Sequence, residues 1–146
     1  MKYAQGIYHP KNPEKYAGKG TIRYRSSWEL TFMQFCDNNP NILAWASEAI
    51  QIPYYNPVKQ TKTHYIPDFF IKYRNADGEE ISELIEIKPS KETSLEAAGR
   101  SVRNQYYAVI NQAKWQAADN WCKNNNIKFR ILTEHDMFSN TTAKKR

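Results

Sequence analysis

The sequence of 146 residues contains no apolar run that could cross a membrane, which takes about 18 consecutive apolar residues. Its first ten residues lack the apolar stretch of a secretory signal. Cysteine is scarce, and Cys36 and Cys122 do not have the spacing of a zinc site, which favours two reduced, packed thiols over a metal or disulfide framework. These absences predict a soluble protein inside a cell, without a membrane partner.

The length and the distribution of charge predict one domain with basic ends. A chain of this size can bury one substantial core but not two. The net charge of +6 comes from the ends, because the last three residues are basic and residues 1–25 carry six basic residues against Glu14. We therefore predict a basic, extended N-terminal arm over residues 1–25, a globular domain over residues 26–138 and a basic tail over residues 139–146.

Basic ends on a slightly acidic body suit a polyanion such as DNA, because each lysine or arginine that meets a phosphate releases counterions. We take Lys19, Arg23 and Arg25 as candidate DNA contacts; Arg25 also precedes a helix start, where free N–H groups bind phosphate. The alternative is that the charged ends only keep the protein soluble.

The spacing of apolar residues predicts a helix, three strands, a helix and a fourth strand. Trp28, Phe32 and Phe35 recur at helical spacing after Ser26, and a long helix is expected where apolar residues recur from Tyr106 to Trp121. An Asp-Gly turn separates two of the strands. The expected strands cover residues 42–54, 64–73, 80–88 and 127–131. An α/β fold with a mixed sheet flanked by helices buries all of these faces.

Two neighbouring strands carry residues suited to metal chemistry. Because side chains alternate along a strand, Glu86 and Lys88 should project together, and a hairpin should bring Asp68 beside them. Two carboxylates and an ammonium suit a hard divalent cation such as Mg²⁺ and its phosphate ligand. The alternative is that Glu86 and Lys88 are ordinary polar positions on a half-exposed strand.

An acidic residue also stands at the start of the first helix. Ser26 to Glu29 form a capping box, in which the serine caps the helix and the glutamate reaches back to the backbone N–H of the cap. Local sequence alone favours this structural role for Glu29 over a role in a metal site.

The residues resemble those of the PD-(D/E)xK nuclease superfamily. The pattern is Pro67-Asp68, seventeen residues and then Glu86-Ile87-Lys88, in a predicted restriction-endonuclease-like αβββαβ order. The resemblance implies that Mg²⁺, with Mn²⁺ as a substitute, is bound by Asp68, Glu86 and the backbone carbonyl of Ile87, and that Lys88 assists the attacking water. It also implies an acidic ligand on the first helix, where Glu29 stands, and an accessory polar residue on the long helix, where Gln112 and Lys114 are candidates.

Longer strings resemble the head completion nucleases of contractile-tailed, T-even-type phages over residues 20–135. They include Tyr24 to Glu29, Trp45 to Glu48, Tyr65 to Phe69 and Asn111 to Trp115. The end-cutting endonuclease subunit of certain transposons is similar over the catalytic half, but it typically has glutamine where this chain has Glu86, which favours the phage family.

The resemblance implies a Mg²⁺-dependent DNA endonuclease that acts after DNA packaging, in the host cytoplasm or on the virion, with phage portal, neck or capsid proteins as partners. Two alternatives stay open. One is a non-catalytic structural or DNA-binding virion protein that retains the nuclease fold, and the other is a nuclease that resolves DNA junctions. Nothing in the sequence indicates an oligomeric state.

Overall fold

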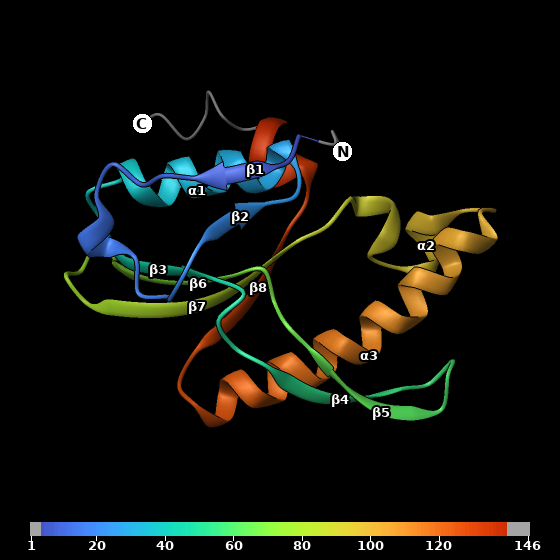
Figure 1. Cartoon of the computed structure of the whole chain (residues 1–146). Coiled ribbons are helices and arrows are strands. Elements are labelled where there is room, and N and C mark those ends of the chain that lie inside the picture. The colour runs from blue at the N-terminus through green and yellow to red at the C-terminus, as the bar shows by residue number, and fades with distance from the viewer. Residues whose placement is uncertain (1–3, 140–146) are drawn as a thin grey trace.

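A central mixed sheet organises the protein in the computed structural model, which describes residues 4–139. Its four strands have the order β3-β6-β7-β8, in which the first three are antiparallel and β8 is parallel to β7. The helices α1 and α3 cover its two faces (Figure 1). The predicted α/β class, with a mixed sheet flanked by helices, is confirmed. The elements are α1 (Ser27–Asn38), β3 (Ile42–Ser47), β6 (Phe69–Arg74), β7 (Glu80–Ile87), α3 (Val102–Asn124) and β8 (Lys128–Leu132).

The core has one layer on each face of the sheet. On the α1 side, Phe32 and Met33 pack with Ile85 and Ile87 of β7. On the α3 side, Leu84 of the same strand packs with residues of the long helix. The period-two alternation predicted for this strand is confirmed, and it places every second residue from Leu84 onward on the α3 side.

The first helix and the hairpin turn form for the reasons that the sequence suggested. Ser26 caps α1, because its Oγ accepts the backbone N–H of Glu29 at 3.2 Å, and the helix ends at Asn38 shortly before Pro40. Between β6 and β7, Gly78 has a φ of 82°, which glycine adopts without strain. Cys36 and Cys122 are free and buried, as predicted.

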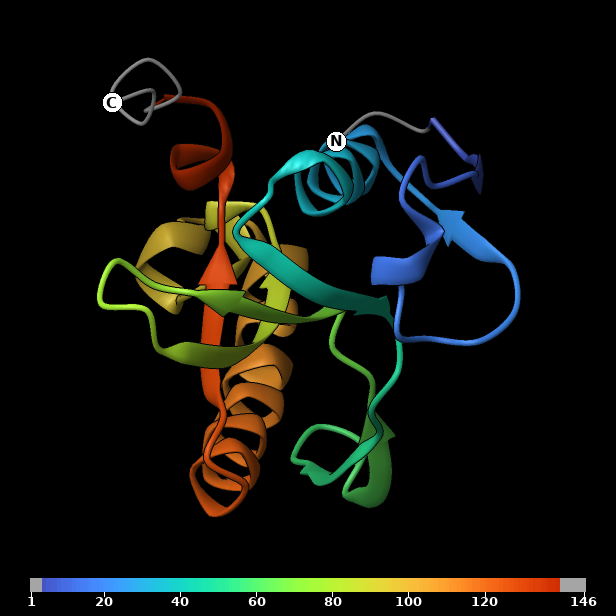
Figure 2. The same cartoon turned by 90° about the vertical axis from the view of Figure 1, so that its left-hand side faces the viewer.

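Two of the expected strands are each split in two. The segment 42–54 leaves the central sheet at Glu48, which has a φ of 51°, and the segment 64–73 is interrupted before Asp68 at Pro67, which has no N–H to donate to a sheet. The separated pieces, β4 (Ile52–Asn56) and β5 (Thr61–Tyr65), pair with each other as a hairpin. Figures 1 and 2 show this hairpin on the α3 side of the central sheet.

The prediction of an extended N-terminal arm is wrong for the described residues 4–25. This segment forms the strand pair β1 (Gly6–Tyr8) and β2 (Ile22–Tyr24) with a 3₁₀ turn, Pro13–Lys15, between them. Ile22 belongs to the core on the α1 side. The buried carboxylate of Asp37 in α1 holds the segment in place, since it accepts the hydroxyl of Tyr8 at 2.6 Å and two backbone N–H groups. In the predicted tail, residues 140–146 lie outside the described residues.

The buried faces of both long helices match the predicted ones only in part, because one predicted residue of each helix lies at the surface. Phe35 is 49% exposed, and Tyr106 of α3 is 37% exposed. In α3, Trp115, Ala118 and Cys122 form part of the core, and the predicted residues Ala117 and Trp121 are partly buried against it. Small residues such as alanine recur at several spacings along α3, so periodicity alone did not define its buried face.

No helix within residues 4–139 is long and apolar enough to span a membrane. The remaining helical elements are the 3₁₀ turn Ser90–Glu92, α2 (Leu95–Ala98) and the π-helical turn His135–Ser139.

Candidate active site

The pairing of β6 with β7 brings Asp68 to Glu86. Phe69 pairs with Ile85 in antiparallel register, so Asp68, which directly precedes β6, lies beside the end of β7. Its Oδ2 accepts the backbone N–H of Ile87 at 2.8 Å. The predicted juxtaposition across the hairpin is correct, although Asp68 stands just before the strand rather than in it. Its carboxylate is therefore fixed by the backbone of the strand that carries Glu86.

Glu86 is buried, with 5% of its surface exposed, on the α3 side of the sheet. Its Oε1 accepts a hydrogen bond of 2.8 Å from the hydroxyl of Tyr65. Its Oε2 lies 3.6 Å from Nζ of Lys88, which projects from the same side of the chain. The predicted group of Asp68, Glu86 and Lys88 is thus brought together at one end of the sheet.

The two carboxylates lie in surroundings that disfavour their charge. Burial raises the pKa of Asp68 well above its ordinary value, and the neighbouring charge of Glu86 raises it further. Burial also raises the pKa of Glu86, against the opposing effects of Lys88 and of the Tyr65 hydroxyl. Two carboxylates that repel each other in a partly dry site form a place where a cation is stabilised.

Only one of the two hydrogen bonds of the predicted capping box forms at Glu29. Its backbone N–H is capped by Ser26, but its carboxylate accepts the backbone N–H of Arg25 at 2.9 Å and not that of Ser26. Burial raises the pKa of Glu29, while the charge of Lys88 lowers it, and Glu29 in turn raises the pKa of Asp68. This carboxylate therefore belongs to the electrostatic surroundings of the site.

Lys114 also joins the site, whereas Gln112 does not. Burial and the nearby charge of Lys88 lower the pKa of Lys114, and Glu86 and Asp68 raise it. Its Nζ lies 5.5 Å from the centroid of the Tyr65 ring. Gln112 is two residues earlier in the helix and therefore points in another direction.

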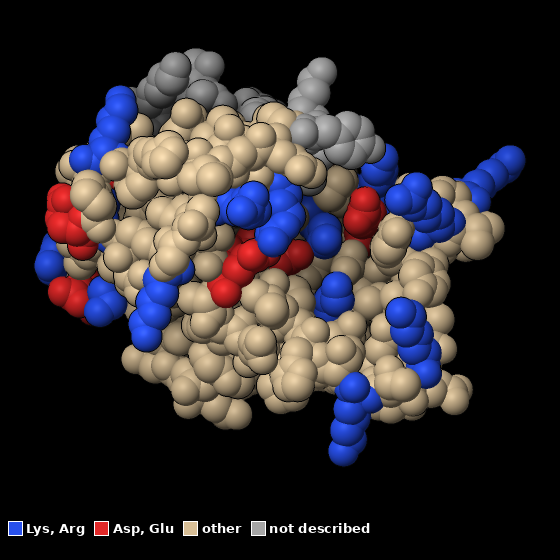
Figure 3. Space-filling model, viewed as in Figure 1, with Lys and Arg blue, Asp and Glu red and all other residues tan. Residues whose placement is uncertain are grey.

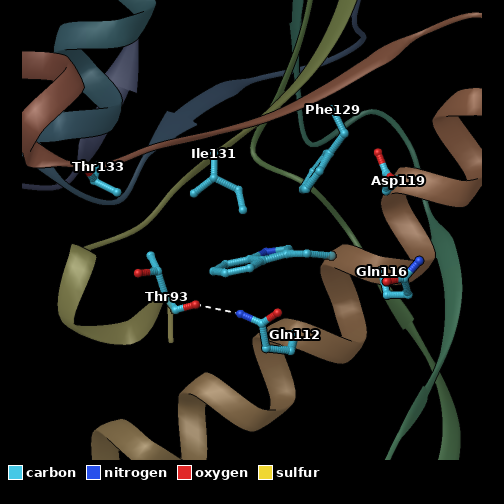
Figure 4. Close-up of a pocket in the computed structure, with 8 residues that line it drawn as sticks. Thr93, Gln112, Gln116, Asp119, Phe129, Ile131 and Thr133 are labelled. Atoms are coloured by element: carbon cyan, nitrogen blue, oxygen red, sulfur yellow. Dashed lines mark hydrogen bonds between the residues drawn. The ribbon is translucent and has the colours of Figure 1, made fainter. Parts of the chain in front are cut away.

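The hollow that contains Gln112 is separate from the carboxylates. The Gln112 amide donates to the backbone oxygen of Thr93 at 2.6 Å, and both residues line an open hollow of about 430 Å³ between α3 and β8 (Figure 4). Trp115, Ile131 and Thr133 also line it. The structure thus selects Lys114 rather than Gln112 as the residue of the long helix that meets the site.

The basic residues predicted as DNA contacts belong to or directly follow the N-terminal strand pair and its connecting loop. Arg25 is exposed and forms an ion pair with Glu48, whose backbone N–H donates to the carbonyl of Asp68 at 2.9 Å. Arg23 is exposed on β2, and Lys19 is exposed in the preceding loop. Their role as DNA contacts stays a prediction.

Two residues next to the site were not identified from the sequence. Tyr65 reads locally as a core aromatic, and nothing in its neighbourhood indicates that its hydroxyl reaches Glu86. Glu48 follows a strand and has no spacing that relates it to Asp68. The only signal was that both residues stand in the strings that resemble the phage family.

Within the described chain, residues 4–139, no group of three or more His, Cys, Asp or Glu residues is arranged to hold a metal ion. The set near β7 instead offers the side chains of Asp68 and Glu86, whose carboxylates accept hydrogen bonds from the Ile87 N–H and from the Tyr65 hydroxyl. Two carboxylates with one backbone carbonyl suit Mg²⁺ better than most cations, because Mg²⁺ keeps several of its waters.

The fold is that of a class of endonucleases. The family model for the N-terminal domain of TnsA-like endonucleases matches residues 39–134. The chain therefore belongs to the TnsA-like endonuclease family, and its predicted restriction-endonuclease-like fold is confirmed. It is also 40% identical to the head completion nuclease of Enterobacteria phage T4 over 144 residues, which cover 92% of this chain and 93% of that protein. The predicted resemblance to head completion nucleases is confirmed.

Proposed function

We propose that this protein is a Mg²⁺-dependent endonuclease that hydrolyses phosphodiester bonds in DNA. The observation that carries the proposal is the convergence of Asp68, Glu86 and Lys88 at one end of the antiparallel pair β6 and β7. Two carboxylates for a metal and an ammonium for the phosphate are the groups that such hydrolysis needs.

The donor set fits Mg²⁺, and Mn²⁺ as a substitute. Asp68 and Glu86 each use one carboxylate oxygen in a hydrogen bond, which orients the other, and the backbone carbonyl of Ile87 would complete the set. When bound, the metal would polarise the phosphate and lower the pKa of a water molecule. Glu29 lies close enough to influence Asp68, and we include it as a further acidic group of the site.

The basic residues of the chain take the remaining roles. The Lys88 ammonium, held 3.6 Å from Glu86, orients the attacking water and offsets the charge that develops on the phosphate. Lys114, half-buried against the Tyr65 ring, adds a second positive charge. Tyr65 fixes the Glu86 carboxylate from the side away from solvent.

The biological setting follows from the relative in phage T4, whose name assigns it to head completion. We propose that this chain likewise acts in phage head completion, on DNA that has already been packaged. It would then work in the host cytoplasm or on the new virion, with portal, neck or capsid proteins as neighbours.

The test is cleavage of supercoiled, linear and branched DNA with Mg²⁺ or Mn²⁺, using the wild type, Lys88→Ala and the exposed control Lys128→Ala on β8. We expect cleavage that stops on chelation, is unchanged in Lys128→Ala and falls by about 10²–10⁴-fold in Lys88→Ala. If all three DNA forms survive both metals, the proposal is wrong. If branched DNA is cut much faster than linear duplex, the enzyme is instead a junction-resolving nuclease.

A further inference from the structure

Exposed basic side chains gather beside the carboxylates, away from the N-terminal segment. They come from the β4–β5 hairpin, the turn after β7 and the start of α3. We call them the basic flank, which consists of Lys59, Lys62, Lys91, Arg100 and Arg103, all of which are exposed. Figure 3 shows acidic side chains at the centre of this face, basic ones directly above them in the region of β1 and β2, and further basic ones on the side where α2, α3 and the hairpin lie.

The basic flank has few charges to neutralise it. Residues 56–66 and 88–118 together hold seven basic residues against two acidic ones, Glu92 and Glu96. Among the described residues, none of the five members of the flank forms an ion pair with a carboxylate. Other basic residues are paired, such as Arg25 with Glu48 and Arg130 with Glu83. The flank therefore presents unbalanced positive charge to solvent.

The basic flank is also joined to the site. The hairpin packs against α3 through β4, and α2 and the turn after β7 pack against the same helix. At the base of the hairpin, the Tyr65 hydroxyl donates a hydrogen bond to Glu86, and Nζ of Lys114 in α3 lies 5.5 Å from the centroid of the Tyr65 ring. The hairpin and α3, which carry three members of the basic flank, therefore also carry two residues that lie next to Glu86 or to its hydrogen-bond partner.

We propose that the basic flank binds the phosphate backbone of duplex DNA on one side of the bond to be cut. Duplex DNA carries about one negative charge per 1.7 Å of its axis. When one phosphate of a duplex lies at Lys88, neighbouring phosphates of the same duplex therefore lie over the protein surface around this residue. Long exposed lysines and arginines contact phosphates without reading bases, so this contact positions the DNA independently of its sequence. The inference rests on the proposed function, and it assigns DNA binding to the hairpin and α3 rather than to Lys19 and Arg23.

The experiment compares two triple variants with the same change in charge. The flank variant is Lys62→Ala, Arg100→Ala and Arg103→Ala, and the control is Lys19→Ala, Arg23→Ala and Lys128→Ala. All six residues are exposed, so both variants should fold. Binding of a fluorescent duplex is measured by anisotropy without divalent metal, from about 50 to 200 mM salt.

We plot the logarithm of the association constant against the logarithm of the salt concentration. In the flank variant, the magnitude of the slope should fall by about 2.7, which is about 0.9 for each of three lost phosphate contacts, and in the control it should stay near the wild-type value. An unchanged slope in the flank variant, or an equal loss in the control, overturns the proposal, as does a wild type that does not bind the duplex. Because no cleavage is needed, the two proposals fail separately: a wild type that binds through the flank but never cuts refutes only the nuclease.

Discussion

Replacing Tyr65 with phenylalanine removes one hydroxyl from the site and keeps the buried ring. That hydroxyl donates to Oε1 of Glu86 at 2.8 Å, and Tyr65 itself is only 4% exposed, so water cannot easily take its place. The hydrogen bond favours the ionised form of Glu86 and fixes the direction of its other oxygen. Both effects favour binding of a divalent cation.

The size of the effect follows from the charge of the acceptor. A hydrogen bond to a charged group contributes about 1.5–3 kcal/mol, which corresponds to about 10- to 150-fold in an equilibrium constant. Groups that orient a metal ligand typically change metal affinity or activity by about 10–100-fold when they are removed. We therefore expect Tyr65→Phe to need about 10–100-fold more Mg²⁺ for half-maximal cleavage.

The assay is the rate of cleavage as a function of Mg²⁺ concentration and of pH. Loss of the hydroxyl removes an effect that lowers the pKa of Glu86, so this pKa rises further. Since the ionised carboxylate binds the metal, the acidic limb of the rate profile should move to higher pH. Tyr55→Phe, on the same hairpin and 52% exposed, is the matched control. The reasoning is refuted if Tyr65→Phe and Tyr55→Phe share the Mg²⁺ dependence and pH profile of the wild type.

Two other substitutions test the N-terminal segment and the first helix. Burial raises the pKa of Asp37, but hydrogen bonds from Tyr8 and from the backbone of Lys11 and Asn12 lower it below its ordinary value. The stability that it contributes is therefore present above its unfolded pKa of about 3.9 and is lost as pH falls through the folded value. Asp37→Asn should cost about 1.5–3 kcal/mol at neutral pH and weaken this acid dependence in urea unfolding; identical pH curves would contradict this. Glu29→Gln keeps an acceptor for the Arg25 N–H, so it should leave the melting temperature unchanged while cleavage falls by about 10–100-fold. Near-normal cleavage would remove Glu29 from the site.

Local patterns in the sequence were sufficient to predict that Asp68, Glu86 and Lys88 come together, because Glu86 and Lys88 are two residues apart at the end of one strand and a short turn joins that strand to the one that Asp68 precedes. Alternation and the turn fix such a geometry without tertiary information. The break at Glu48 could not be predicted in this way, since both pieces of that segment alternate as one strand would. Tyr65 was missed for a related reason: its partner is set by how the hairpin folds back on α3, which depends on packing between distant segments.

The buried face of α3 and the docking of residues 4–25 are also tertiary properties. In α3, alanines at several spacings permit more than one apolar face, and the sheet selects the one that contains Trp115 and Ala118. For the N-terminal segment, the basic residues and glycines of the local sequence predicted an extended arm. They gave no sign of the buried Asp37 in α1, which accepts hydrogen bonds from this segment.

The chain leaves the central sheet to form the β4–β5 hairpin and returns to the sheet at the same place. Ser47 pairs with Phe69, and the N–H of Glu48 bonds to the carbonyl of Asp68 directly beyond that pair. The pairing of Ser47 with Phe69 therefore fixes the register of the central sheet at the place where the hairpin branches from it. A change in the hairpin that shifts its base also moves the Tyr65 hydroxyl, and with it the Glu86 carboxylate that this hydroxyl holds. Sequence changes in the hairpin, which would alter the proposed contacts of Lys59 and Lys62 with DNA, are therefore limited by the need to keep Glu86 in place.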